Sequence, residues 1–418
     1  MLKPLSNEVR KAVVQEVVKL TREKYVFPDR GKELANQIQD KLEDGGYDAI
    51  TDAHEFASVL TSDLRDISDD RHWSVIYDPD ETVATIDPEK QEDQAQVSFW
   101  LELNRRNNFG FEKVERLKGN IGYIDIRQFA PSEFAAETAI AAMNFVSNCD
   151  ALIFDVRKAH GGYPSMVQLI TSYLVDPEPK HINTFYYRPT DDTQQFWTFP
   201  HVPGKRLVDI PIYVLTSNAT GSGAEAFVYN LKHMERATII GETTIGAAHP
   251  VTLEIVQDHF KVRLPYGRPI NPITKENWEG TGVDPHILVC AEDALKTAHI
   301  HAIKQLVEKC EDDLQKAELD WQVEIVRSEY KPIVLDEIVL VRYAGDYGNR
   351  TFSVADGTLT YMHQDHPIAW ELNPVTETSF RLDEDLKFEF LVGEEGQPSS
   401  VVISYADGRP EITLNRSA

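Results

Sequence analysis

The stretch Ala151-Leu-Ile-Phe-Asp155, continued by Val-Arg-Lys-Ala-His-Gly-Gly162, decides how the middle of the chain is interpreted. Its first five residues form a nearly continuous apolar run, which is typical of a strand buried on both faces of a sheet. The glycine pair then precedes a helical pattern over residues 164–174. The same order recurs where the apolar run of residues 210–215 precedes a helical pattern over residues 223–234. Repeated strand–helix–strand order predicts a layered α/β domain with crossover connections.

Further elements extend this α/β domain in both directions. Residues 251–255 and 260–264 predict a hairpin that turns at Asp258 and His259. We therefore place the α/β core at residues 68–310. Its other expected elements are strands at 121–126 and 237–240 and helices at 132–146 and 292–308.

The flanking regions have different patterns. Residues 6 to about 67 show helical periodicity behind the N-cap candidate Ser6, which predicts a small helical bundle over residues 1–67. From Pro332 onward, short strand patterns, one of them at residues 338–343, alternate with Asp-Gly and Glu-Gly turns. The expected C-terminal unit is a small β-barrel or β-sandwich over residues 331–418, preceded by a linker over residues 311–330.

The composition excludes several classes of protein. The chain has 418 residues with 42 basic and 68 acidic side chains, and its net charge of −26 disfavours a nucleic-acid partner. No apolar run approaches the roughly 18 residues that a membrane span needs. The N-terminus lacks the apolar segment of a signal peptide, so the chain as given is expected to be cytoplasmic. A trimmed signal peptide would instead indicate a periplasmic or secreted protein.

No cofactor or metal is predicted from residue spacing. The three cysteines form neither a CxxC pair nor a zinc-ligand pattern. His299 and His301 lie two residues apart, whereas shared coordination from one helix face needs a spacing of four. The sequence contains no phosphate-binding P-loop.

The strongest local signal for chemistry is Thr216-Ser-Asn-Ala-Thr-Gly-Ser-Gly-Ala-Glu225. A buried strand ends just before it, and Ser222 lies at the start of the next helix, between Gly221 and Gly223. Glycines let a substrate approach the backbone, and the first N–H groups of a helix have no partner within it. A serine here therefore has an oxyanion site beside it. The alternative is that Ser222 only caps the helix.

A second turn adds to this signal. Gly161 and Gly162 follow another buried strand, and ligand sites in such sheets lie outside the carboxyl ends of the strands. A serine nucleophile also needs a base. Three of the thirteen histidines, His72, His160 and His249, are candidates, and composition alone does not choose among them.

Five blocks of residues, in this order along the chain, resemble the C-terminal-processing (tail-specific) serine proteases. The resemblance is closest to the subgroup with the repeat modules of interphotoreceptor retinoid-binding protein and to the tricorn protease core. The blocks are Asp70-Arg-His72, Asp155 to Gly162, Thr216 to Glu225, Gly241-Glu-Thr-Thr-Ile-Gly246 and Trp278-Glu-Gly-Thr-Gly-Val-Asp-Pro285.

The resemblance implies a crotonase/ClpP-like layered core and a serine peptidase. It places Ser222 on the family nucleophile and His72 on the general base. Glu279 falls on the acidic residue that polarises the base. The N–H groups of Gly162 and Gly223 fall on the oxyanion positions.

The sequence departs from the family pattern at several positions. Ala247 stands where the processing proteases carry a lysine base, so His72 is the expected base. Arg71 replaces the serine that precedes the histidine in the tricorn-like branch. This leaves open whether Glu279 reaches His72 directly, through Ser74 or through water.

Two further histidines are candidates for contacts with substrate. His160 replaces a common asparagine in the second block, and His249 follows the fourth block. No segment resembles the PDZ domain with which processing proteases gather C-terminal tails.

The leading hypothesis is a serine-type peptidase that cleaves peptides or proteins by acyl transfer, with Ser222 as nucleophile and His72 as base. One alternative is a non-catalytic module that binds an apolar ligand such as a retinoid or fatty acid, because the retinoid-binding repeats resemble this fold. Another is an esterase or amidase that acts on small substrates. The sequence does not indicate the oligomeric state.

Overall fold

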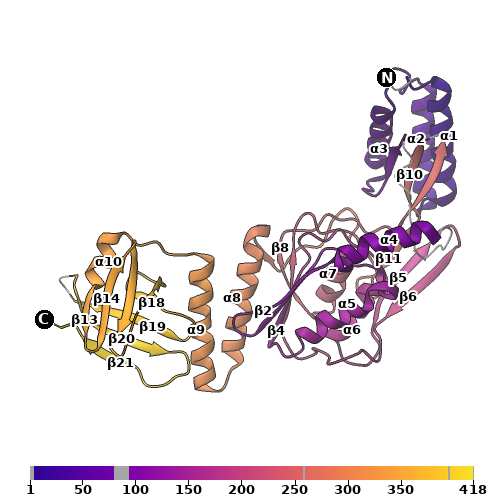
Figure 1. Cartoon of the computed structure of the whole chain (residues 1–418). Coiled ribbons are helices and arrows are strands. Elements are labelled where there is room, and N and C mark those ends of the chain that lie inside the picture. Colours follow the sequence, from indigo (N-terminus) through magenta and orange to yellow (C-terminus); the bar gives the residue numbers. More distant parts are fainter. Residues whose placement is uncertain (1–3, 80–93, 258, 394–395, 418) are drawn as a thin grey trace. The chain divides into compact units, whose positions relative to one another are not determined.

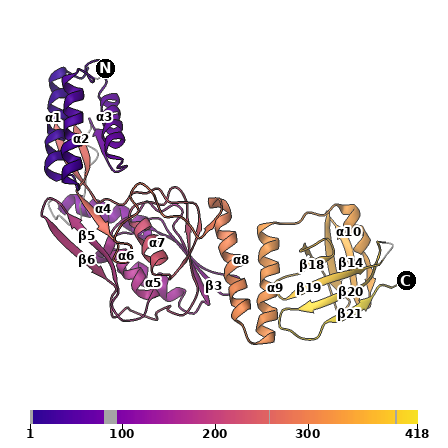
Figure 2. The same cartoon turned by 180° about the vertical axis from the view of Figure 1, so that it is seen from behind.

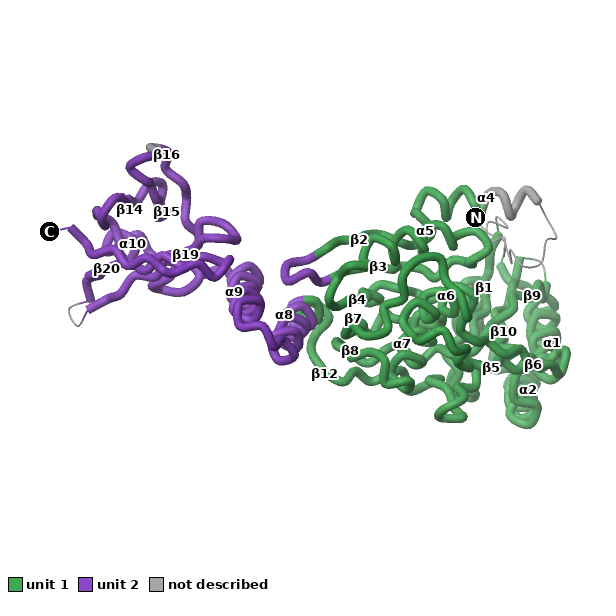
Figure 3. The backbone as a smooth tube through the Cα atoms, turned by 90° about the horizontal axis from the view of Figure 1, so that it is seen from below, with its two compact units in different colours: residues 1–116, 122–295 green, residues 117–121, 296–418 purple. Residues whose placement is uncertain are grey.

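The computed structural model describes residues 4–79, 94–257, 259–393 and 396–417. The chain forms two compact units, which Figure 3 distinguishes by colour. Unit 1 comprises residues 1–116 and 122–295, and unit 2 comprises residues 117–121 and 296–418. The expected α/β core, N-terminal helical region and C-terminal small sheets are confirmed. Among the described residues, no helix combines the length and apolar character that a bilayer span requires.

The centre of unit 1 is a six-stranded sheet with the strand order β12-β8-β7-β4-β3-β2 (Figure 1). β7 runs parallel to both β4 and β8. The apolar runs behave as predicted, because every residue of β4 and of β7 is buried. The strands are β2 (Phe111–Leu117), β3 (Ile121–Ile126), β4 (Ala151–Asp155), β7 (Ile212–Thr216), β8 (Thr238–Gly241) and β12 (Ile287–Leu288).

Three helices provide the predicted crossovers and lie side by side next to this sheet (Figures 1 and 2). They are α5 (Ser132–Phe145), α6 (Pro164–Leu174) and α7 (Gly223–His233). Phe154 of β4 and Phe227 of α7 pack together in the shared apolar core. Because β4 and β7 are parallel neighbours, the turns that follow them lie together at one edge of the sheet.

A second sheet of unit 1 was not predicted from the sequence. It has the order β11-β5-β6 and is antiparallel. Most residues of β6 are exposed, so this strand lacks the apolar run that marks a central strand. The elements added here are α4 (Gln94–Arg106), a 3-10 helix (Asn108–Gly110), β5 (His181–Tyr187), β6 (Asp192–Trp197) and β11 (Gly267–Ile270).

The N-terminal region consists of α1 (Asn7–Lys24), α2 (Pro28–Glu43) and α3 (Ala53–Ser68), as the helical periodicity predicted. Ser6 and Asp52 cap α1 and α3, since each side chain accepts a hydrogen bond from a backbone N–H in the first turn. The helices share their apolar core with a small sheet.

This small sheet has the order β1-β10-β9. Its strands are β1 (Ser74–Tyr77) and the predicted hairpin of β9 (Val251–Gln257) and β10 (Phe260–Pro265), whose turn residue Asp258 lies outside the described residues. Phe260 of β10 packs in one apolar cluster with Phe56 of α3. Arg263 pairs with Ser74 on one side and Leu253 on the other, so β1 and β9 begin at the same end of the sheet.

Unit 2 contains most of α8 (Ala291–Lys309) together with α9 (Asp313–Tyr330) and α10 (Glu337–Tyr343). The segment 311–330, expected as a linker, is therefore largely helical, and Asp312 caps α9. The strand predicted at residues 338–343 is wrong, because this segment forms α10. Its buried residues Leu340 and Tyr343 lie three positions apart, which is helical spacing.

Two antiparallel sheets form the rest of unit 2, with orders β13-β14-β15-β16 and β17-β18-β19-β20-β21. Phe352, Phe388 and Phe390 lie in their common apolar core. The strands are β13 (Gly345–Tyr347), β14 (Arg350–Ala355), β15 (Thr358–His363), β16 (His366–Glu371), β17 (Asn373–Pro374), β18 (Ser379–Arg381), β19 (Leu386–Val392), β20 (Pro398–Tyr405) and β21 (Ile412–Asn415).

Candidate active site

Ser222 lies between β7 and α7, and its backbone has a conformation that few side chains adopt. Its φ is 50° and its ψ is −121°. A non-glycine residue held in a sparsely populated region costs about 1–3 kcal/mol, and such residues concentrate at functional sites. A sharp strand-to-helix turn of this kind presents a serine hydroxyl at the edge of a sheet. The strain therefore favours a functional role for Ser222 over a simple capping role.

Glu225 joins the Ser222 turn to a second loop. Its Oε2 accepts the N–H groups of Ser222 and Ala247 at 2.8 and 2.9 Å. Its Oε1 accepts the Thr244 hydroxyl at 2.6 Å and the Gly246 N–H at 2.7 Å. Burial raises the pKa of Glu225, although these four hydrogen bonds favour the charged form. This role of Glu225 was not predicted from the sequence, although its spacing from Ser222 is the Ser-x-x-Glu signature of a helix start.

Gly161 and Gly162 lie so close to the Ser222 turn that no larger residue fits. Their φ values are 103° and 138°, in the region that favours glycine. A Cβ on Gly161 would lie 2.7 Å from Ser222 Cβ, and a Cβ on Gly223 would lie 2.9 Å from Gly162 N. The two glycines whose N–H groups were predicted to bind an oxyanion are therefore adjacent.

Phe129 fixes the glycine turn from its other side. The Phe129 N–H donates to Gly161 O at 2.8 Å, and the Tyr163 N–H donates to Phe129 O at 2.7 Å. Neither of these hydrogen bonds involves the Gly162 N–H. Within the described ranges, neither the Gly162 nor the Gly223 N–H donates a hydrogen bond. Two free N–H donors beside a serine are what a developing oxyanion requires.

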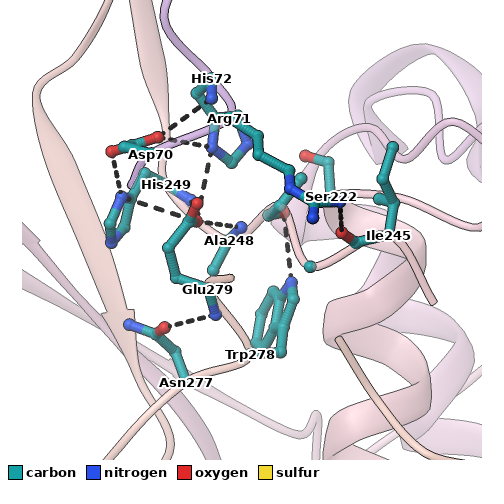
Figure 4. A network of polar contacts seen from close by, with 12 residues as sticks. Asp70, Arg71, His72, Ser222, Ile245, Ala248, His249, Asn277, Trp278 and Glu279 are labelled. Atoms are coloured by element: carbon teal, nitrogen blue, oxygen red, sulfur yellow. Dashed lines mark hydrogen bonds and ion pairs between the residues drawn. The ribbon is translucent and has the colours of Figure 1, made fainter. Parts of the chain in front are cut away.

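The predicted base lies on a different part of unit 1. His72 is two residues before β1 and His249 is two residues before β9, so the common end of their sheet brings the two rings to a centroid distance of 6.1 Å. Asp70 Oδ2 lies 2.7 Å from His249 Nδ1, and Asp70 Oδ1 lies 3.4 Å from His72 Nδ1. Glu279 Oε2 lies 3.4 Å from His72 Nδ1 and 3.5 Å from His249 Nδ1 (Figure 4). We call Asp70, His72, His249 and Glu279 the histidine–carboxylate cluster.

Backbone donors hold Glu279 in this position. Its Oε2 accepts the N–H groups of Ala248 and His249 at 2.6 and 3.1 Å. Its own N–H donates to Asn277 Oδ1 at 2.9 Å. The Glu279 carboxylate thus faces His72 Nδ1 directly rather than through Ser74.

The cluster is buried and charged. The exposed fractions of the side chains are 2% for Asp70, 3% for His249, 12% for His72 and 13% for Glu279. Burial lowers the pKa of His72, but the carboxylates of Asp70 and Glu279 outweigh this effect and raise the pKa to about 9. Burial raises the pKa of Asp70, whereas the adjacent histidines hold it well below its usual range. His72 is therefore protonated at neutral pH in the free protein.

Arg71 connects the segment of the cluster to the loop beside Ser222. Its guanidinium donates to Ile245 O at 3.1 Å, and the Ile245 N–H donates to Thr220 O at 3.1 Å (Figure 4). In Figure 4, Ser222 lies on the side of His72 away from Asp70. In the part of the chain that the structure describes, no hydrogen bond joins the Ser222 hydroxyl to His72.

The two other predicted histidines lie in different surroundings. His160 is exposed next to Gly161, near the Ser222 turn, and its N–H donates to Arg127 O at 3.4 Å. His249 is buried against Asp70, away from an open surface that a substrate would contact.

The comparisons with known proteins agree with the class of protein that this fold suggests. Residues 120–289 match the family described as Peptidase family S41. Residues 5–106 match the N-terminal domain of Peptidase_S41 in eukaryotic IRBP. The two matches together cover more than half of the chain, which belongs to peptidase family S41.

Individual relatives are distant. The chain is 24% identical over 214 residues to the carboxy-terminal processing protease CtpB of Bacillus subtilis (strain 168), a match that covers 50% of this chain and 42% of that protein. The chain thus spans less than half the length of this relative.

Two solved structures are similar in fold. A putative peptidase from Parabacteroides merdae is 19% identical with a TM-score of 0.49, over 69% of this chain and 92% of that one. The tricorn protease is 18% identical with a TM-score of 0.45, over 77% of this chain and 37% of that one.

Proposed function

We propose that this chain is a serine peptidase that cleaves peptides or proteins by acyl transfer, with Ser222 as nucleophile and His72 as general base. One observation carries the proposal: the strained Ser222 turn packs against Gly161 and Gly162, with two free N–H groups beside it. Membership of a peptidase family supports the reaction class and a protein substrate.

In the first step, His72 takes the proton of the Ser222 hydroxyl while the oxygen attacks the carbonyl carbon of a peptide bond. The N–H groups of Gly162 and Gly223 stabilise the negative carbonyl oxygen of the tetrahedral intermediate. His72 then gives the proton to the leaving amine, which leaves an acyl group on Ser222. Water, deprotonated by His72, releases this acyl group by the same sequence of steps.

Asp70 and Glu279 act on His72 rather than on the substrate. Both carboxylates lie beside Nδ1, so they orient the ring with Nε2 available to Ser222 and stabilise the imidazolium that forms during the reaction. Catalytic hydrogen bonds are often long in a free enzyme. We expect the Ser222–His72 hydrogen bond to form when substrate binds.

Labelling with a fluorophosphonate probe, followed by peptide mass mapping, tests this function. We expect the probe to attach to Ser222, to be lost in Ser222→Ala and to react more slowly in His72→Ala. The matched control is Ser62→Ala, since Ser62 is exposed on α3. A peptide library then tests whether the labelled protein cleaves peptide bonds.

The outcomes separate the possible functions. A folded wild-type protein that remains unlabelled would contradict the nucleophile assignment and favour a module that binds an apolar ligand. Labelling of Ser222 with turnover of small esters alone would favour an esterase.

A further inference from the structure

The histidine–carboxylate cluster contains more polar groups than catalysis by a serine peptidase requires. A single carboxylate suffices to orient a catalytic histidine. Here two carboxylates and two imidazoles converge, and one donor atom from each residue lies within 4.8 Å of the others. The second pair, Asp70 and His249, is the more deeply buried of the two.

Several polar atoms of this cluster have no hydrogen-bond partner. Among the described residues, these buried atoms include Nε2 of His72, Nε2 of His249 and Oε1 of Glu279, while His72 Nδ1 has only its two ion-pair contacts at 3.4 Å. A buried polar atom without a partner is unfavourable by roughly 1–3 kcal/mol, and such atoms are rare in folded proteins. His72 Nδ1 is the atom among them that faces the cluster, and its two contacts are longer than a charge-assisted hydrogen bond, which favours an additional group between these residues.

Three separations between these residues are close to the edge length of a metal-coordination tetrahedron, and all four ligand atoms lie within 4.8 Å of one another. Zinc bonds of about 2.0–2.1 Å to nitrogen and oxygen place neighbouring ligand atoms about 3.3–3.4 Å apart. His72 Nδ1 lies 3.4 Å from an oxygen of Asp70 and 3.4 Å from one of Glu279, and His249 Nδ1 lies 3.5 Å from that Glu279 oxygen. Charge-assisted hydrogen bonds are shorter, at about 2.7–2.9 Å. A fourth contact, from His249 Nδ1 to the other carboxylate oxygen of Asp70, Oδ2, is 2.7 Å and would have to lengthen when an ion binds.

The type of ligand selects the type of metal. Imidazole together with carboxylate suits Zn²⁺, which takes four ligands in a tetrahedron. Ca²⁺ and Mg²⁺ prefer six or more oxygen ligands, which two carboxylates with two histidines do not provide. The two carboxylates also offset the charge of a divalent ion inside a buried site.

Backbone N–H groups already orient two of the four proposed ligands, Asp70 and Glu279. The backbone N–H of His72 donates to Asp70 Oδ1 at 3.0 Å. The backbone N–H groups of Ala248 and His249 donate to Glu279 Oε2. Such outer contacts around metal ligands fix their orientation and contribute strongly to affinity. Most of the orientation that a metal site needs is therefore present before an ion binds.

We propose that Asp70, His72, His249 and Glu279 form a binding site for Zn²⁺, and that the bound ion inhibits the enzyme. The inhibitory part of this inference rests on the proposed function. A neutral imidazole that binds zinc through Nδ1 keeps its proton on Nε2, and this nitrogen then has no lone pair to accept the Ser222 proton. Zinc at this site therefore removes the general base without touching Ser222.

Binding is tested on the full-length chain, freed of metal by a chelator, by calorimetric titration with ZnCl₂. We expect one Zn²⁺ per chain and no binding of MgCl₂ at the same concentration. His249→Ala and Asp70→Asn should each weaken zinc binding by more than about 100-fold, the upper range for loss of a mere outer contact. His201→Ala is the matched control, since His201 is an exposed histidine outside the cluster, and it should bind zinc like the wild type.

The absence of saturable binding at one ion per chain would overturn the site. Equal zinc affinity in the wild type and in Asp70→Asn would overturn it too, and this variant keeps the volume of the side chain if His249→Ala does not fold.

Inhibition is tested by the rate at which a fluorophosphonate probe labels Ser222. Saturating zinc should slow labelling of the wild type by about 100-fold, the lower end of what a general base contributes. A chelator should restore the rate, and His249→Ala should label at a rate that zinc does not change. Stoichiometric zinc binding with unchanged labelling would overturn the inhibition alone. A wild type that is unlabelled even without zinc would count against the proposed function, while the titration would still decide whether the metal site exists.

Discussion

The Ser222 turn is built from backbone, whereas the histidine–carboxylate cluster is built from charged side chains. In the turn, glycines and a strained serine fix the positions of two N–H groups, and Glu225 accepts the Ser222 N–H. In the cluster, the positions and proton affinities of four side chains depend on one another. The difference teaches that the geometry of the turn is set mainly by the backbone, whereas the state of the cluster depends on which of its side chains carry a proton.

The largest effect should come from Ser222, on which we expect both the turn and the histidine–carboxylate cluster to act. Ser222→Ala should lower kcat/KM by about 10⁴-fold or more, because the acyl intermediate no longer forms. Peptide turnover by purified protein measures this, with Ser62→Ala as the control. Turnover that survives in Ser222→Ala would show that neither half acts through this serine.

The next largest effect should come from a substitution that disturbs the backbone around Ser222 and leaves the histidine–carboxylate cluster unchanged. A Cβ on Gly162 would lie 2.1 Å from Phe129 O, so Gly162→Ala must displace the turn and misalign one oxyanion donor. We expect kcat to fall by about 10²–10³-fold, the effect of losing such a donor, with an unchanged pH midpoint. Gly357→Ala is the control, because Gly357 also has a positive φ but nothing lies within 4 Å of the added Cβ. A wild-type kcat in Gly162→Ala would show that this turn does not contribute to catalysis.

A third prediction isolates the charged half through pH. His72 must lose its proton to act as a base, so kcat/KM should rise with pH and level off above the pKa of about 9. The Glu279 carboxylate favours the protonated ring, so Glu279→Gln should move this midpoint to lower pH. The control is Glu276→Gln, since Glu276 is exposed and lies three residues away. An identical pH midpoint in the wild type and in Glu279→Gln would show that Glu279 does not influence the pKa of His72.

The smallest effect concerns stability. The pKa of His72 is raised from 6.5 to about 9 on folding, so the stabilisation is fully present below pH 6.5 and is lost as the pH rises through 9. The loss should be at most about 3 kcal/mol, from 1.36 kcal/mol per pKa unit. Urea unfolding at pH 6.5 and pH 9.5 measures it, and His72→Gln should reduce the difference. A wild type whose unfolding free energy does not fall over this interval would contradict the raised pKa.

The sequence predicted the backbone half well, because its determinants are local. The apolar runs that form β4 and β7 end directly at the Gly161–Gly162 and Ser222 turns, and parallel neighbours place such turns together. Each step from pattern to geometry used residues close in the chain. Even Glu225, whose role was not predicted, lies only three residues from Ser222.

The charged half could be predicted only in part. The resemblance to a known family placed His72 and Glu279 on functional positions, but His249 reaches Asp70 through the pairing of β1, β10 and β9. The pairing partner of the predicted hairpin was not evident from local patterns, which say little about long-range strand contacts. The same limit explains why residue spacing did not reveal the cluster, since its four residues come from three distant segments of the chain.

The pairing of β1 with β10 also sets an order of events during protein synthesis. β1 ends at residue 77, but its hydrogen-bonding partner is not complete until residue 265 has been made. At elongation rates of about 5–20 residues per second, this delay lasts on the order of 10–40 seconds. During that interval the nascent chain has no sheet to hold Asp70 and His72 against His249. The histidine–carboxylate cluster therefore cannot assemble on the ribosome before β10 has emerged.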